Sequence, residues 1–231
     1  MHRSLTRRSL LTGAGTAGVG LFLARPGAGA GSDELSPTPR QIEGPFYPVA
    51  EQADNDVDLT QVEGHAQAAR GTRLVLEGTV RTIDGAPVPG ALVEIWQACA
   101  TGRYNHPRDR NPAPLDPDFQ YWGRLAADAS GGYRFKSIKP GAYPNTSDWT
   151  RPPHIHFRVV VPGFRSLTTQ MYFAGEDLNA KDRILQDLAP AERKLVIVAF
   201  GPAAGGADQH AGRFDIVVGA QAQQGTTPQL D

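Results

Sequence analysis

Two histidines lie two residues apart in the segment RPPHIHF, which occupies positions 151–157. Residues i and i+2 of a β-strand point to the same face, so His154 and His156 would lie side by side. Ile155 and Phe157 would then occupy the opposite face. Two adjacent imidazoles fill an apolar core poorly but suit a metal ion. The spacing is compatible with a metal site, and equally with two hydrogen-bonded structural histidines.

Two tyrosines in long polar connections are further candidate ligands. Tyr104 lies in GRYNH and Tyr143 in GAYP, and the second connection leads directly into the histidines. A phenol ionises near pH 10 in water, so a phenolate ligand at neutral pH requires a strongly charged cation beside it. Ferric iron is such a cation and also accepts imidazole, whereas zinc prefers cysteine, histidine and carboxylate. The set favours Fe(III), although either tyrosine alone is more often a packing residue.

Other metal sites fit the sequence less well. A cupin-type site would place a glutamate shortly after the histidine pair, where the chain has FRVVV. A site of two histidines and one carboxylate has Asp148 nearby, but no strand register directs that side chain toward the histidines.

The elements that would carry these residues are short β-strands. Runs rich in β-branched and apolar residues are bounded by Gly, Pro, Asp and Asn, which is typical of a sandwich or barrel. One helical pattern stands out, KDRILQDLA at 181–189, and Pro190 is expected to end it. The predicted fold class is all-β, a β-sandwich core with long active-site loops and one or two short helices. The expected strands are 72–80, 91–98, 131–138, 154–161, 167–173, 194–200 and 213–219.

Two connections, 99–120 and 139–153, are unusually long for a compact sandwich. Loops of this length are often functional, and each of these carries one of the tyrosines. The chain has a single cysteine, Cys99, which excludes an intrachain disulfide. It ends an apolar strand pattern, so we expect a buried and inert thiol.

The first 30 residues differ in composition from the rest. Arg7 and Arg8 precede a Gly- and Ala-rich apolar stretch that ends in Ala28-Gly29-Ala30, the layout of a twin-arginine export signal with a cleavage site. An uncleaved membrane anchor is the alternative, but the stretch is short and glycine-rich for a membrane span. The sequence predicts export by the twin-arginine route to a periplasmic or extracellular location.

The mature chain would be mildly acidic. Removal of 1–30 takes away four arginines and no acids, so the formal charge changes from -1 to -5. This charge argues against nucleic acid as a partner, and against the membrane once the signal is cleaved. We expect a linker at 31–43, one domain at 44–219 and a loose polar tail at 220–231.

The chain resembles the intradiol ring-cleavage dioxygenases, most closely those of the protocatechuate 3,4-dioxygenase β-subunit type. The resemblance covers residues 43–218 and is specific because many motifs occur in the family's order. These motifs are EGPFYP, GAPVPGALVEIWQA, GRYNH, APLDPDF, GGYRFKSIKPGAYP, DWTRPPHIHF, TTQMYF and GRFDIVV.

The resemblance implies a mononuclear non-haem Fe(III) site, with one ion per chain. The implied ligands are Tyr104, Tyr143, His154 and His156. Tyr143 would also act in catalysis, as a base for a substrate proton. Arg151 matches the family's arginine beside the substrate, and Gln170 matches a glutamine near the iron. Without the resemblance, Arg151 could be a surface ion-pair residue and Gln170 a strand residue that bonds a neighbouring loop.

The resemblance also implies the reaction and the partners. A small aromatic ortho-diol and O2 would be the substrates, and a muconate-type diacid the product. The chain would form either a homo-oligomer or a pair with a related subunit. Asn145 and Thr146 stand where protocatechuate enzymes often have tryptophan and arginine, which leaves the choice between protocatechuate and catechol types open.

A second resemblance involves only two segments. GAPVPGALVEIW and GGYRFKSIKPGAY also resemble transthyretin-like and carboxypeptidase-regulatory sandwiches, which are binding or structural modules without a metal. A structural sandwich has no need of GRYNH and RPPHIHF, so these motifs favour the dioxygenase.

Overall fold

Two β-sheets and a projecting hairpin make up the fold of the computed structural model, which describes residues 34–50, 54–163, 166–203 and 206–219. In the first sheet, the central strand β1 pairs antiparallel with β4 and parallel with β11 and then β12, while β10 pairs with β11. Its strands are β1 Arg73–Thr82, β4 Gly132–Ile138, β10 Phe200–Ala203, β11 Gly206–Arg213 and β12 Ile216–Val218.

The second sheet has the strand order β3-β2-β7-β8-β9. Its members are β2 Leu92–Trp96, β3 Trp122–Ala126, β7 His154–Val160, β8 Leu167–Phe173 and β9 Ile197–Val198. The core lies between the two sheets. Phe157 of β7, for example, contacts Phe214 at a ring-centroid distance of 4.9 Å and Tyr133 of β4 at 6.1 Å. The predicted all-β sandwich is confirmed.

The helical segment differs in detail from the prediction. A 3₁₀ helix, η1 Asp177–Lys181, precedes the short helices α1 Arg183–Gln186 and α2 Pro190–Val196. Pro190 therefore begins a helix rather than ending one, because proline lacks only a donor that the first helical position leaves free anyway. The strand expected at 194–200 is wrong in its first half, since α2 continues to Val196.

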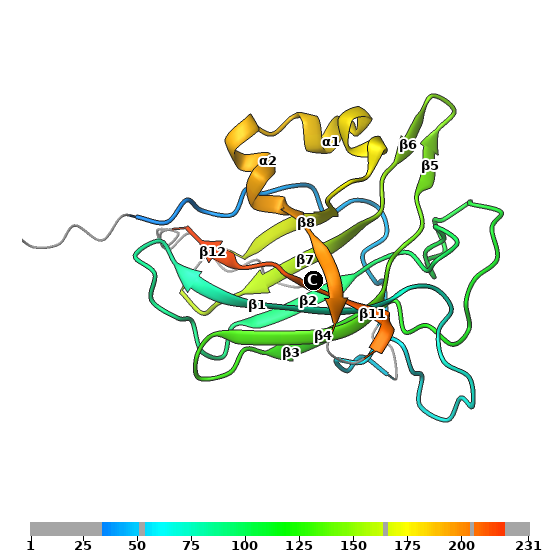
Figure 1. The fold of residues 1–231 in the computed structure, drawn as a ribbon, viewed down its shortest axis with the longest axis horizontal. Helices are drawn as coiled ribbons and strands as arrows, with labels where there is room; N and C mark the ends of the chain where they lie inside the picture. The colour runs from blue at the N-terminus through cyan, green and yellow to red at the C-terminus, as the bar shows by residue number, and fades with distance from the viewer. Residues whose placement is uncertain (1–33, 51–53, 164–165, 204–205, 220–231) are drawn as a thin grey trace, which may run out of the picture. The chain divides into compact units, whose positions relative to one another are not determined.

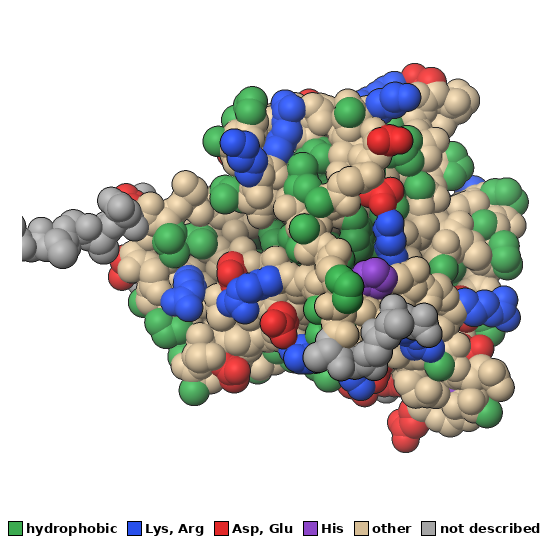
Figure 2. Space-filling view, viewed as in Figure 1, with side chains coloured by type: hydrophobic (Ala, Val, Ile, Leu, Met, Phe, Trp, Pro, Cys, Tyr) green, Lys and Arg blue, Asp and Glu red, His purple; other side chains and the backbone are tan. Residues whose placement is uncertain are grey.

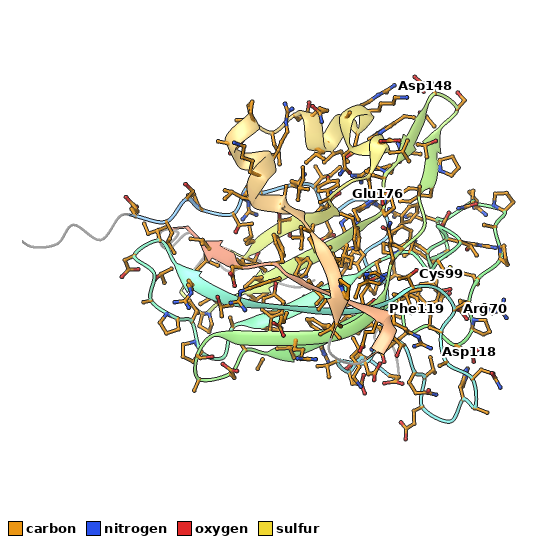
Figure 3. All side chains as sticks on the ribbon, viewed as in Figure 1. Arg70, Cys99, Asp118, Phe119, Asp148 and Glu176 are labelled. Carbon is orange, nitrogen blue, oxygen red and sulfur yellow. The ribbon has the colours of Figure 1, made fainter. Side chains whose placement is uncertain are left out.

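The site-bearing segments gather at one end of the sandwich. The hairpin of β5 Tyr143–Thr146 and β6 Trp149–Arg151 projects there, beside the long loop 99–120 (Figure 1). Figure 3 shows Asp148 at the tip of this hairpin and Cys99 at the root of the loop. Cys99 is fully buried, as expected. Lys and Arg side chains are mixed with Asp and Glu on the face in Figure 2, so this face carries no single-sign surface.

Residues 34–43, expected as a linker, are irregular but lie along the sandwich. Thr38 N donates to Val217 O at 3.0 Å, and Gln41 N donates to Thr168 O at 2.9 Å. These bonds attach the segment to β12 and β8. The predicted signal at 1–30 and the tail at 220–231 lie outside the described residues. Within the described ranges, no helix is long and apolar enough to cross a membrane.

Candidate metal centre

Strand β7 presents its two histidines on the face turned away from the inter-sheet core. Ile155 and Phe157 are fully buried in that core, as the alternation of a strand requires. His154 and His156 lie on the other face, where each is 2% exposed because loops cover it. The sheet therefore holds both imidazoles on a rigid backbone.

Neighbouring strands set the surroundings of these histidines. His156 lies opposite Trp96 of β2 and Gln170 of β8, and His154 lies opposite Tyr172 of β8. Opposite residues share a face of the sheet, so all five side chains line one surface. Trp96 stacks on His156, with ring centroids 4.8 Å apart and planes at 11°.

Tyr104 is held by a close approach between the two long loops. Gly102 has a φ of 81°, and a Cβ at this position would lie 2.2 Å from Ala142 O, just before Tyr143. Only glycine fits both the backbone conformation and the space. The Asp109 carboxylate then accepts a hydrogen bond from Tyr104 N at 2.7 Å and fixes the loop around the phenol.

The two tyrosines and two histidines converge. Tyr104 Oη lies 3.5 Å from His154 Nε2. Ring centroids are 5.5 Å apart for Tyr104 and Tyr143, 5.6 Å for Tyr143 and His154, and 4.9 Å for the two histidines. The ring centroids of His156 and Tyr104 are 6.3 Å apart. Residues from β7, β5 and a distant loop therefore form one closed ring of side chains.

The histidines are in the form that binds metals. His154 Nδ1 bonds to the carbonyl of Pro152 at 2.7 Å, which leaves the lone pair on Nε2, facing Tyr104. His156 Nδ1 is buried and has no hydrogen-bond partner. Burial, together with the nearby charge of Arg151, holds the pKa of both histidines well below the usual value. Both imidazoles are therefore neutral.

The phenols need a cation to ionise. Burial raises the pKa of Tyr104 well above its usual value, and also that of Tyr143, where Arg151 opposes the effect. In the described part of the chain, no cluster of three or more His, Cys, Asp or Glu side chains could hold a metal. The donor set of two phenols and two neutral imidazoles therefore fits a hard, highly charged cation.

Arg151 and Gln170 both lie against this ring of side chains. Arg151 Nη1 is 3.3 Å from His154 Nε2, and Nη2 donates to Gln170 Oε1 at 2.8 Å. Gln170 Nε2 in turn donates to Ile42 O at 2.9 Å, which ties the N-terminal segment to the site. Arg151 is 3% exposed, so it is not a surface residue.

Three residues that shape this site are not among the predicted site residues. Asp182 is fully buried and accepts two hydrogen bonds from Arg151. Trp96 supplies the stack on His156. Phe46, in the motif EGPFYP, lies over Tyr104 with ring centroids 4.7 Å apart. The alternation of β2 could have identified Trp96, whereas nothing local distinguishes Asp182 from an ordinary helix cap.

A protein-family model described as Dioxygenase matches residues 42–220, most of the chain. The chain belongs to the intradiol ring-cleavage dioxygenases. It is 45% identical to the protocatechuate 3,4-dioxygenase beta chain of Burkholderia cepacia over 159 residues, 68% of each chain. It is 38% identical to a chlorocatechol 1,2-dioxygenase of Pseudomonas sp. (strain P51) over 45% of each. The family comprises oxidoreductases that incorporate two oxygen atoms.

Solved structures agree with this assignment. The dioxygenase domain of a carbohydrate-binding fusion protein from Streptomyces sp. SirexAA-E has a TM-score of 0.60 at 28% identity, covering 80% of this chain and 99% of that one. Catechol 1,2-dioxygenase from Pseudomonas arvilla C-1 has a TM-score of 0.61 at 28% identity, covering 81% and 63%. The chain spans about half the length of the curated catechol 1,2-dioxygenases that it matches.

Proposed function

We propose that this intradiol dioxygenase uses one non-haem Fe(III) per chain to cleave a small aromatic ortho-diol with O2, giving a muconate-type diacid. The observation that carries this proposal is the convergence of Tyr104, Tyr143, His154 and His156 on one another. Buried phenols are poor metal ligands unless the cation is strongly charged, which favours ferric iron over zinc.

These four residues would hold the iron. When bound, Fe(III) would polarise the diol and make its ring reactive toward O2. Tyr143, ionised by the cation, would take up one diol proton at Oη. Burial raises the pKa of this phenol, with the adjacent Arg151 guanidinium opposing, so the phenolate is a base strong enough for this step. Arg151 would stabilise negative charge that develops on the substrate, since a fixed charge in a buried site acts strongly on it. Gln170 would keep the guanidinium in place.

The substrate class is a single-ring diol of the protocatechuate or catechol type. Both kinds of enzyme occur among the relatives. Asn145 and Thr146 are exposed on the β5–β6 hairpin, so neither offers the buried aromatic or cationic wall that a substituted ring would favour. We expect the unsubstituted ring of catechol to be accepted at least as well as protocatechuate.

A direct experiment combines colour with oxygen uptake. Tyrosinate bound to Fe(III) absorbs visible light, so iron-loaded protein should be coloured, and the band should shift when a diol is added. Oxygen uptake should follow with one or more of catechol, protocatechuate, hydroxyquinol and chlorinated catechols. Protein that binds stoichiometric iron but remains colourless would contradict the tyrosine ligands.

Export is a separate proposal that rests on the sequence of 1–30. Arg7 and Arg8 would direct the chain through the twin-arginine route, and the mature protein would begin near Gly31. Replacing both arginines with lysine should leave folded protein in the cytoplasm. An exported protein that still begins at Met1 would contradict cleavage.

The assembly of the chain is a further proposal, either as a homo-oligomer or as a pair with a related subunit. Light scattering of the mature protein, alone and with such a subunit, would test it.

A further inference from the structure

Arg151 and Asp182 form a buried, two-point ion pair. Arg151 Nε donates to Asp182 Oδ1 at 2.9 Å, and Nη2 donates to Oδ2 at 3.0 Å. Arg151 is 3% exposed and Asp182 is fully buried. Burial alone would lower the pKa of Arg151, but the bonds to Asp182 and the nearby phenols raise it. The guanidinium therefore keeps its charge although it is buried.

Asp182 is itself held from two further directions. It is the N-cap of α1, where its Oδ2 accepts a hydrogen bond from Leu185 N at 3.1 Å. Trp149 Nε1, on β6, donates to its Oδ1 at 3.2 Å. The carboxylate therefore connects the start of α1 to the hairpin that carries Arg151. Its position is fixed by these bonds independently of Arg151.

This arrangement determines which nitrogen of Arg151 points toward the histidines of the candidate metal centre. Asp182 accepts hydrogen bonds from Nε and Nη2. Gln170 and Tyr172 also accept from Nη2, at 2.8 and 3.2 Å. Nη1 is left to point toward His154 Nε2 at 3.3 Å. A guanidinium is rigid and planar, so fixing two of its nitrogens fixes the third.

We propose that Asp182 is a positioning residue, which orients the Arg151 guanidinium toward the reacting diol and compensates its charge. The inference rests on the proposed role of Arg151 in catalysis. Residues that orient a functional group through hydrogen bonds commonly contribute about 10- to 100-fold to activity. Asp182 would act through Arg151 alone, without contact with the substrate or the iron.

The test is Asp182→Asn, which keeps the shape and the helix cap but can accept from only one of the two guanidinium donors. Turnover should fall about 10- to 100-fold, while iron content, the visible band and its shift with catechol remain. Asp182→Ser, a smaller cap that cannot reach Arg151, should behave alike. The matched control is Asp148→Asn, which removes an exposed carboxylate paired with Arg183 at 2.7 Å and should leave turnover unchanged.

A double-variant cycle separates positioning from general damage. If Asp182 acts through Arg151, Arg151→Ala with Asp182→Asn should turn over no more slowly than Arg151→Ala alone. In iron-free protein, Arg151→Ala should lower Tm because it leaves a buried charge unpaired, and adding Asp182→Asn should raise Tm again. This Tm readout holds even if no diol is cleaved, so it is independent of the proposed function. Normal turnover in Asp182→Asn, loss of its iron band, or additive losses in the double variant would each overturn the proposal.

Discussion

The indole of Trp96 stacks on the imidazole of His156, with ring centroids 4.8 Å apart and planes 11° from parallel. The two residues are cross-strand partners on β2 and β7, and Trp96 is 1% exposed. Tyr47 packs edge-on against the indole, with ring centroids 5.0 Å apart. The imidazole plane is therefore set by packing, which is notable because its buried Nδ1 has no hydrogen-bond partner to orient it.

Trp96→Leu should therefore weaken iron binding without touching a ligand. The imidazole would be free to rotate about its side-chain bonds, and loss of an orienting contact typically costs about 10- to 100-fold in metal affinity. Competition with a chelator, followed through the visible band, would measure the loss. Trp96→Phe, which keeps an aromatic stack, should retain most of the affinity; equal losses in both variants would show that bulk rather than stacking matters.

Removal of either histidine should abolish the coloured centre. His154→Ala and His156→Ala each delete one of four converging donors, so iron content and the visible band should be lost together. The control is His210→Ala, which changes a partly exposed histidine on β11 in the other sheet. Stoichiometric iron in both His154→Ala and His156→Ala would contradict the ligand assignment.

Gly102 gives a prediction about how the two tyrosine loops are joined. Gly102→Ala would place a Cβ 2.2 Å from Ala142 O and 3.3 Å from Tyr143 Cβ, so the loops must separate. Gly64→Ala is a matched control because Gly64 has nearly the same φ, 80° against 81°, with nothing within 4 Å of the added Cβ. Both variants carry a left-handed alanine at a cost of roughly 1 kcal/mol.

The overlap should cost Gly102→Ala a further ~2 kcal/mol, and it alone should lose iron. Chemical unfolding of the iron-free proteins would measure the first effect, and metal analysis the second. Equal behaviour of the two glycine variants would mean that the loops are not coupled in this way.

The sandwich was predictable because most of its strands bury one face. The period-two alternation at 154–161, for instance, places Ile155 and Phe157 in the core and predicts β7 correctly. The strand β3 was missed because its five residues WGRLA show little alternation and rely on pairing with β2. At 194–200, a run of apolar residues fits a strand and a buried helix end equally well. The chain uses it for both, because α2 continues to Val196 and β9 follows at Ile197–Val198.

The site was predictable where its chemistry shows in residue type. The histidine spacing indicates a shared face, and the phenols of the two long loops made Tyr104 and Tyr143 candidate ligands. Because loops have no register, only the resemblance to the family implied that all four residues bind one ion. Asp182 could not be found in this way. It lies 31 residues from Arg151 in sequence, and an aspartate before a helix is expected for capping alone.

Asp58 gives a pH-dependent prediction for the loop that precedes β1. Its carboxylate accepts hydrogen bonds from Lys136 Nζ at 2.8 Å and Thr60 Oγ1 at 2.6 Å. Partial burial alone would raise the pKa of Asp58, but these bonds outweigh it and lower the pKa below the usual 3.8. A lowered pKa in the folded state means that the carboxylate stabilises the fold above the unfolded pKa, and that this contribution is lost as pH falls through the folded pKa.

Asp58→Asn should therefore be less stable than the parent by about 1 kcal/mol at pH 7. The difference should shrink below about pH 4 as the parent carboxylate becomes protonated. Urea unfolding of iron-free protein between pH 7 and pH 3 would follow it. Glu77→Gln, which removes an exposed ion pair with Arg134, should differ little from the parent throughout. A difference for Asp58→Asn that stays constant with pH would show that charge is not its origin.

Variants of Arg151 distinguish a role in turnover from a role in diol binding. If its charge acts on the diol only after oxygen has attacked, its removal should reduce turnover more than diol affinity. Arg151→Ala should keep the iron band and the shift on adding a diol, while oxygen consumption falls by about 100-fold or more. Arg151→Lys keeps the charge but cannot make the two-point contact with Asp182, so its turnover should be intermediate.

Arg183→Ala is the control for the arginine variants, because this side chain, next to Asp182, is 57% exposed and pairs only with Asp148 among the described salt bridges. Its turnover should match that of the parent. If Arg151→Ala instead turned over normally at saturating diol and lost only affinity, Arg151 would serve to bind the substrate. The buried pair with Asp182 would then explain where the diol sits, because the fixed Nη1 would be a docking point for one of its oxygens rather than a stabiliser of the reacting ring.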